Sequence, residues 1–238
     1  MRRGFATFLL IVTAATSVLA QTGATSQAAP PTKPAQPTAV IDTAAGKMTC
    51  TLFPDKAPIG VENFIGLATG KKDWKNANGV AKHGVPLYDG TVFHRVIPGF
   101  MIQGGDPAGT GSGPDPVKPF KNEVSSDLLF NQPGRLAYAN SGPNTNTSQF
   151  FITEVAFTGQ QATILNGHYT IFGQCDDAAV ELVKQIARMS TDPSNDRPFR
   201  PVKINHIAIS GAGSMAKPAG TTAKKPATTT QKAPSSSN

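Results

Sequence analysis

The stretch "FHRVIPGFMIQGGD", residues 93–106, carries most of the information about the fold. Its pattern predicts two short strands, 91–97 and 100–103, joined by a proline–glycine turn. Side chains alternate between the two faces of a strand, so Arg95 falls on the same face as two apolar neighbours. An arginine in such a place is usually a salt-bridged surface residue or one that reaches past apolar neighbours to water. A functional interpretation of Arg95 therefore needs support from the rest of the chain.

On both sides of this stretch, the chain shows several strand patterns and two helix patterns. A helix is predicted over 57–70, where Pro58 suits the first turn and Gly70 a stop, and another over 176–189, where acidic residues begin it and basic residues end it. Period-two or short apolar runs predict a hairpin and four further strands, at 39–53, 134–140, 148–155, 168–175 and 202–209. Many short strands with two helices and glycine turns predict a closed or nearly closed β-barrel capped by helices.

The two ends of the chain differ from this middle part. Residues 1–20 have a basic start, an apolar stretch and small residues before a cleavage site, which predicts a secretory signal peptide and export to the periplasm or the medium. Residues 21–38 are a Pro/Thr/Ala linker and 213–238 a basic tail, and both compositions predict disorder. One folded domain is expected at 39–212, with no integral membrane segment after signal cleavage.

The net charge of +7 does not belong to the predicted domain. Of the 22 Lys+Arg, seven lie outside 39–212, which leaves 15 against 15 Asp+Glu inside it. A domain that binds nucleic acid should carry a basic excess on its folded part. We therefore expect no nucleic-acid partner.

Residue spacings also argue against several kinds of chemistry. His83 and His206 lie in unrelated segments, and the His, Cys and carboxylate spacings do not match a metal site. Ser141 and Ser148 have no partnered base in sequence reach, which argues against a serine hydrolase. The glycine-rich run after residue 103 lacks the strand–helix context of a phosphate loop. We expect no metal and no cofactor.

Three motifs in order resemble one known family. "FHRVIPGFMIQGGD", "ANSGPNTNTSQFFIT" at 139–153 and "YTIFG" at 169–173 are similar to the cyclophilins, and the resemblance covers essentially all of 39–212. It implies a closed eight-stranded antiparallel β-barrel capped by two α-helices. It also implies a monomeric peptidyl-prolyl cis/trans isomerase, here of an exported bacterial type, acting on proline-containing polypeptides without a covalent step.

The resemblance assigns roles residue by residue. Arg95 matches the catalytic arginine, and Gln103 the side chain that orients it and the substrate backbone. Substrate-binding positions are implied at Phe100, Met101, Gln103, Gly109, Ala139, Asn140, Ser141, Gln149, Phe151, Ile164, Leu165 and Tyr169. Tyr169 stands where many members have histidine, and Ile164 where the members that bind cyclosporin have tryptophan.

The expected reaction explains why an arginine would be needed. Twisting an X–Pro bond breaks amide resonance, against a barrier of roughly 18–20 kcal/mol, and returns a lone pair to the prolyl nitrogen. A guanidinium donor aimed at that nitrogen binds the twisted form better than either planar form. The runner-up interpretation is a non-catalytic chaperone or proline-peptide-binding module that uses the same groove.

Cys50 and Cys175 are the two cysteines of the chain. Export favours disulfides, and in the cyclophilin barrel the strands that hold these positions would be neighbours. Against a bond, Cys50 is expected on the inward face of its strand, and buried free thiols are common. The sequence leaves the bond open.

Overall fold

The computed structural model describes residues 36–211. The predicted signal peptide, 1–20, and tail, 213–238, lie outside the described residues, as does all but the last three residues of the predicted linker, 21–38. Within 36–211, helices that are long and apolar enough to cross a membrane are absent.

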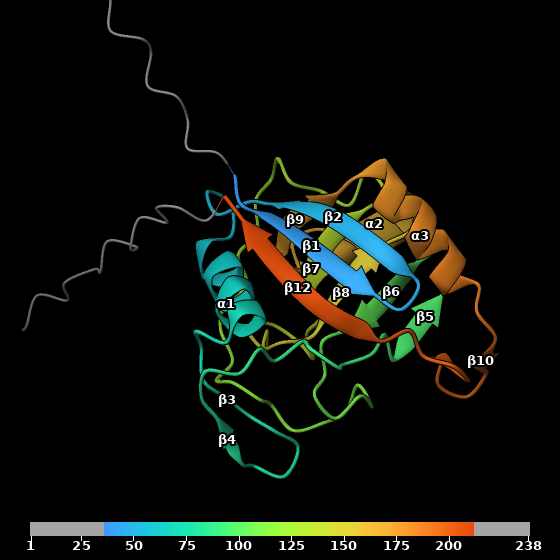
Figure 1. The fold of residues 1–238 in the computed structure, drawn as a ribbon. Coiled ribbons are helices and arrows are strands. Elements are labelled where there is room, and N and C mark those ends of the chain that lie inside the picture. The colour runs from blue at the N-terminus through green and yellow to red at the C-terminus, as the bar shows by residue number, and fades with distance from the viewer. Residues whose placement is uncertain (1–35, 212–238) are drawn as a thin grey trace, which may run out of the picture. The chain divides into compact units, whose positions relative to one another are not determined.

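Eight antiparallel strands form one curled sheet in the order β12-β1-β2-β9-β7-β8-β6-β5 (Figure 1). In chain order they are β1 (Thr38–Thr43), β2 (Gly46–Leu52), β5 (Arg95–Ile97), β6 (Met101–Gly104), β7 (Arg135–Tyr138), β8 (Phe150–Thr153), β9 (Ile171–Cys175) and β12 (Ile204–Ser210). Two small hairpins stand apart from the sheet: β3 (Trp74–Lys75) with β4 (Ala81–Lys82), and β10 (Thr191–Asp192) with β11 (Arg197–Pro198). The strand positions and the mainly β class agree with the sequence prediction.

The sheet is a half-open barrel, so the predicted closed barrel is slightly overstated. The edge strands β5 and β12 are not paired in a ladder. The segment before β5 contacts the start of β12 and the residues before it. Phe93 N–H donates to the Val202 carbonyl at 3.0 Å, and Ile204 N–H donates to the Thr91 carbonyl at 2.8 Å. β5 begins only at Arg95, so too little strand remains to continue the pairing.

Helix α1 (Pro58–Thr69) confirms the first predicted helix. Pro58 opens it, and Gly70 ends it in the left-handed region, at φ 71°. Its N-cap, Ala57, has no side-chain acceptor. The carboxylate of Glu123 supplies one from a distant loop, accepting the N–H groups of Ile59 at 3.0 Å and Gly60 at 2.8 Å.

Helix α3 (Asp177–Ala187) confirms the second predicted helix, and its N-cap Asp176 accepts the N–H of Ala179 at 2.8 Å. A third helix, α2 (Gly159–Leu165), was not predicted, so two capping helices was an undercount. It has seven residues, of which only Leu165 is buried. A helix this short, with one buried residue, has too little apolar periodicity to be recognised in the sequence.

Buried side chains form two clusters. The larger one includes the buried faces of the sheet and of helices α1 and α3, and it contains Phe64, Tyr88, Phe150 and Phe172 in tilted or edge-to-face contacts. The smaller cluster consists of Met101, Phe130, Ala137, Phe151, Phe157, Leu165 and Ile171. This second cluster holds several of the predicted site residues.

A disulfide joins Cys50 on β2 to Cys175 on β9, where the two residues are direct cross-strand partners. Both cysteines are buried in the larger cluster. The bond therefore fastens two neighbouring strands of the sheet whose cysteines are 125 residues apart in the chain.

Candidate active site

The smaller apolar cluster is the floor of the candidate site. Strands β6 and β8 and the end of α2 contribute Met101, Phe151 and Leu165, which are at most 5% exposed. Phe100, Ala139 and Tyr169 are partly buried and pack against the same cluster. The structure thus brings six of the sequence-predicted binding residues to one apolar surface.

Aromatic contacts fix the shape of this floor. Phe151 stacks on Phe130 at a centroid distance of 5.7 Å and meets Tyr169 edge-to-face, also at 5.7 Å. Phe100 lies edge-to-face on Phe157 at 5.5 Å. Sequence reasoning did not identify Phe130 or Phe157, because both lie in loops and their aromatic character was the sole signal.

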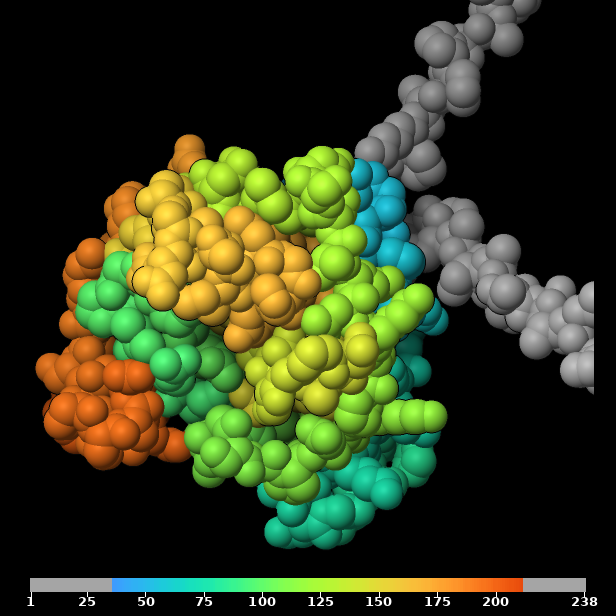
Figure 2. Space-filling model, turned by 180° about the vertical axis from the view of Figure 1, so that it is seen from behind, coloured from blue at the N-terminus to red at the C-terminus, as the bar shows by residue number. Residues whose placement is uncertain are grey.

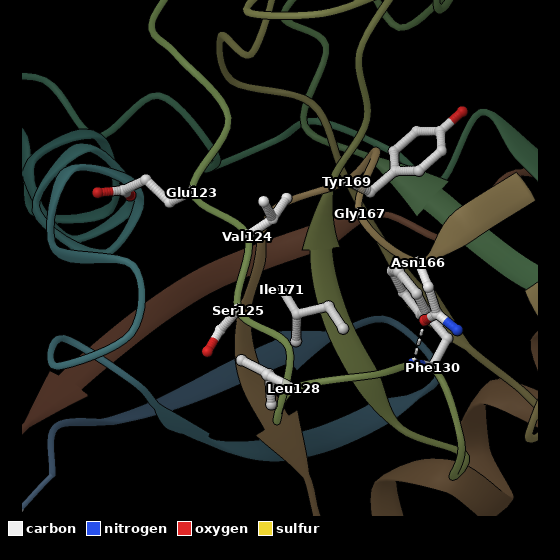
Figure 3. Close-up of a pocket in the computed structure, with 9 residues that line it drawn as sticks. All are labelled: Glu123, Val124, Ser125, Leu128, Phe130, Asn166, Gly167, Tyr169 and Ile171. Atoms are coloured by element: carbon white, nitrogen blue, oxygen red, sulfur yellow. Dashed lines mark hydrogen bonds between the residues drawn. The ribbon is translucent and has the colours of Figure 1, made fainter. Parts of the chain in front are cut away.

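Beside this floor, a small solvent-open pocket shares Phe130 and Ile171 with the smaller cluster (Figure 3). It is lined by Glu123, Val124, Ser125, Leu128, Phe130, Asn166, Gly167, Tyr169 and Ile171. The Glu123 side chain turns away from the pocket toward α1, where it caps the helix, and Asn166 accepts the Phe130 N–H at 2.9 Å. Glu123 and Asn166 thus have structural roles.

Arg95 lies on β5 at the rim of the site, opposite Gln103 in the β5–β6 ladder. Its Nε donates to Oδ2 of Asp196 at 3.2 Å, and the two side chains are 40% and 41% exposed. Gln103 instead donates to Oε1 of Gln149 at 3.0 Å. The side chain bonded to Arg95 is therefore Asp196, which no sequence pattern had indicated.

The turn that separates Arg95 from Phe100 is anchored by a buried carboxylate. Glu154 is 1% exposed. One of its oxygens accepts the Gly99 N–H at 2.7 Å, and the other accepts Nη1 of Arg188 at 2.5 Å. The glutamate ties the C-terminus of α3 to the β5–β6 turn, and sequence reasoning missed it.

The loop after β6 forms another side of the site. The Gln149 amide donates to the Gly111 carbonyl at 3.1 Å, and the Gly109 carbonyl accepts Nη1 of Arg197 at 2.6 Å. Asp106 organises this loop from within. Burial alone would raise the pKa of its carboxyl, but donors from Ala108, Thr110 and Gly111 outweigh that effect and hold the pKa below its usual range.

His94 points to the opposite face of the strand from Arg95. It is 3% exposed, and neither ring nitrogen makes a hydrogen bond of normal geometry. Burial lowers the pKa of the imidazole below 6.5. The imidazole is therefore buried and neutral near pH 7, which makes it a poor candidate for an acid or a base in the site.

The remaining predicted residues lie around the edge. The Asn140 amide donates to the His168 carbonyl at 3.0 Å, and the Ser141 N–H donates to the Thr145 hydroxyl at 2.9 Å, which shapes the loop after β7. Ile164 is 58% exposed and lies outside the apolar cluster, although its neighbour Leu165 is inside it. Ile164 is thus separated from the floor.

The arrangement combines a half-exposed guanidinium with an adjoining apolar floor and amide side chains. Among residues 36–211, groups of three or more His, Cys, Asp or Glu side chains that could hold a metal are absent. Such a site can hold an apolar ring and present hydrogen-bond donors beside it.

Comparison with known proteins gives consistent matches. Residues 38–209 match the family described as cyclophilin type peptidyl-prolyl cis-trans isomerase/CLD. The chain is 49% identical to peptidyl-prolyl cis-trans isomerase A of Mycobacterium tuberculosis over 174 residues, which is 73% of this chain and 92% of that protein. It is 45% identical to peptidyl-prolyl cis-trans isomerase B of Streptomyces anulatus, over 72% of this chain and 95% of that protein.

Solved structures agree. A cyclophilin type peptidyl-prolyl cis-trans isomerase from Cryptosporidium parvum superimposes with a TM-score of 0.60 at 34% identity, over 73% of this chain and 96% of that one. A second structure of that protein, determined in the presence of the dipeptide Ala-Pro, gives a TM-score of 0.59 at 33% identity, over 72% of this chain and 98% of that one.

Proposed function

The chain belongs to the cyclophilin-type peptidyl-prolyl cis-trans isomerase family, and from this premise we propose that Arg95 assists the rotation of X–Pro bonds in proteins that fold after export. Isomerase activity is the property that its relatives share. The observation that carries the proposed mechanism is the position of Arg95, half-exposed at the rim of the floor formed by Met101, Phe151 and Leu165.

In the proposed mechanism, the apolar floor binds the proline ring and Arg95 at the rim stabilises the twisted bond. The proline ring packs on the apolar floor and is held still while the residue before it rotates. As the bond twists, the prolyl nitrogen regains a lone pair, which can accept a hydrogen bond from the free N–H groups of Arg95. Because the planar forms lack that acceptor, the guanidinium stabilises the twisted form selectively. The Ala-Pro dipeptide studied with the Cryptosporidium parvum relative is a ligand of the class that this arrangement would take.

The setting of the reaction is proposed from the ends of the chain. The signal-like sequence of residues 1–20 supports export to the periplasm or the medium. There, uncatalysed X–Pro isomerisation takes tens to hundreds of seconds, which is slow enough to limit folding. The balanced charge of 39–212 argues against nucleic acids as partners, and membership of the family supports proline-containing polypeptides as substrates of an enzyme that we propose is monomeric.

The test measures turnover of a short X–Pro peptide by the mature domain, using exchange NMR so that weak activity is still detected. Arg95→Ala should lower kcat/KM about 100-fold or more, the size expected for loss of one transition-state donor. Arg95→Lys should also be poor, because an ammonium lacks the planar fork of donors. A near wild-type rate for Arg95→Ala would rule out the proposed role.

The same experiment separates the enzyme from a non-catalytic peptide-binding module. The urea midpoint of Arg95→Ala should stay close to that of the wild type, because Arg95 is 40% exposed and outside the buried clusters. A wild-type domain that binds prolyl peptides without accelerating their exchange would favour the binding module.

A further inference from the structure

The contact between Arg95 and Asp196 carries a consequence for catalysis. We infer that Asp196 is the positioning residue for Arg95, and that the hairpin β10–β11 aligns the guanidinium with the loop on the other side of the site. This inference rests on the proposed role of Arg95. It concerns a residue 101 positions away in the sequence, which joins Arg95 through its carboxylate at 3.2 Å.

Asp196 is held to β5 by its main chain as well as its side chain. Its carbonyl accepts the Val96 N–H at 3.0 Å, so it bonds to the main chain of one residue and the side chain of the residue before it. Its backbone is in the left-handed region, at φ 59°, a conformation that aspartate, asparagine and glycine tolerate better than other residues. Asp196 is therefore bonded to β5 at two adjacent residues.

The turn that carries Asp196 is internally braced. The Asp192 carboxylate accepts bonds from the main chain and hydroxyl of Ser194 and from the amide of Asn195, and its carbonyl accepts the Asp196 N–H at 2.9 Å. Asn195 in turn accepts the Arg197 N–H at 3.0 Å. A short hairpin with this many internal bonds is a stiff support for a functional side chain.

The next residue connects the hairpin to the opposite part of the site. Nη1 of Arg197 donates to the Gly109 carbonyl at 2.6 Å, in the loop that Gln149 also contacts through Gly111. Figure 2 shows the orange segment that contains β10 and β11 lying beside the green segment that contains β5 and β6. Asp196 and Arg197, which are consecutive in the chain, thus contact β5 and the loop after β6, respectively.

The geometry at Arg95 suits this purpose. The carboxylate occupies Nε, which leaves the N–H groups of the two terminal nitrogens for a substrate. A partner at Nε also restricts rotation of the Arg95 side chain before the substrate binds. Arg95 therefore loses less conformational entropy when it stabilises the twisted X–Pro bond. Exposed ion pairs add little to domain stability. A positioning role therefore predicts a loss of turnover without a matching loss of stability.

The test replaces Asp196 in two ways that preserve its backbone. Asp196→Asn keeps the oxygen acceptor, and Asp196→Gly removes the side chain while tolerating the positive φ. With an Ala-Pro-containing peptide, we expect Asp196→Gly to lower kcat about tenfold with little change in KM, and Asp196→Asn to stay within about threefold of the wild type. The matched control is Asp42→Asn. Asp42 is a partly exposed aspartate on β1 that pairs with Lys47 on β2, and β1 makes no ladder with β5, β6 or β8, so this variant should leave turnover unchanged.

A double variant separates this inference from the proposed function. In an Arg95→Ala background, Asp196→Gly should cause no further loss, because its effect passes through the arginine. If Arg95→Ala loses activity but Asp196→Gly keeps wild-type kcat, the positioning role is wrong while the role of Arg95 stands. An equal further loss in the Arg95→Ala background would also refute it, since Asp196 would then act independently. If Arg95→Ala itself is fully active, the proposed mechanism fails first.

Discussion

Removing the disulfide between Cys50 and Cys175 should cause a large loss of stability with no change in catalysis. The bond closes a loop of 125 residues. The chain-entropy relation gives about 16 cal/mol/K for such a loop, or about 5 kcal/mol at 25 °C. Residual compactness of the unfolded chain reduces that value, so the expected loss in unfolding free energy is about 3–5 kcal/mol.

The assay is equilibrium urea unfolding followed by far-ultraviolet circular dichroism. Tryptophan fluorescence is less suitable, because Trp74 lies on the β3–β4 hairpin outside the main sheet. With a denaturant slope of about 2 kcal/mol/M, the midpoint of a Cys50→Ala/Cys175→Ala variant should fall by about 1.5–2.5 M. Wild-type protein unfolded with and without reductant is the control, because it breaks the bond without removing buried sulfur atoms.

Catalysis supplies the second half of this test. Arg95, Met101 and Phe151 lie on β5, β6 and β8, whereas the disulfide joins β2 to β9. The floor of the site meets β9 only at Ile171, at the opposite end of that strand from Cys175. At temperatures where the reduced protein is folded, kcat/KM should equal that of the oxidised protein. A midpoint shift below about 0.5 M, or two freely alkylated thiols in unreduced denatured protein, would refute the reasoning.

Two further predictions concern single residues. Burial holds the pKa of His94 in the folded protein below 6.5. As the pH falls below 6.5, the unfolded chain therefore binds a proton at His94 that the folded chain does not bind. The free energy of unfolding should decrease as the pH falls from 6.5 to the folded-state pKa. In urea titrations at pH 7, 6 and 5, the free energy of unfolding of His94→Gln should decrease less than that of the wild type. A difference in unfolding free energy between the two proteins that does not change with pH would contradict the prediction. Ile164→Trp should strengthen cyclosporin inhibition about ten- to a hundredfold in a peptide assay, since an indole adds an aromatic face and an N–H donor at this exposed position. If cyclosporin inhibits the unmodified protein as tightly as it inhibits relatives with tryptophan, Ile164 does not occupy the position of that tryptophan.

Local pattern explains what the sequence could predict of the fold. Pro58 and Gly70 mark the two ends of α1, and Asp176 caps α3, because start and stop signals act within one turn of helix. The helix α2 escaped prediction since only Leu165 of its seven residues is buried. The degree of barrel closure depends on how many residues pair between distant edges, and no local signal reports that.

The family resemblance named several residues of the candidate site, and it did not name the residues that support them. Met101, Phe151 and Leu165 meet in one cluster, and their role in binding stays a prediction. Asp196 and Glu154 support the strand and turn around Arg95 from far along the chain, at 101 and 59 positions from it. Their contacts arise from tertiary packing, and an isolated carboxylate in a polar turn looks the same in sequence whether or not it has such a partner.

The pairing of the first strand with the last makes the folded body topologically close to a ring. Thr38 lies opposite Ser210 in the β1–β12 ladder, and the two strands run side by side (Figure 1). A short glycine linker could join these ends, and new ends could be opened in the turn between Asn76 and Gly79. Such a circular permutant would keep every strand pairing of the main sheet and the position of Arg95 beside the apolar floor. The permutant would change the order in which the strands are synthesised. The effect of that order on folding could then be measured with the native contacts unchanged.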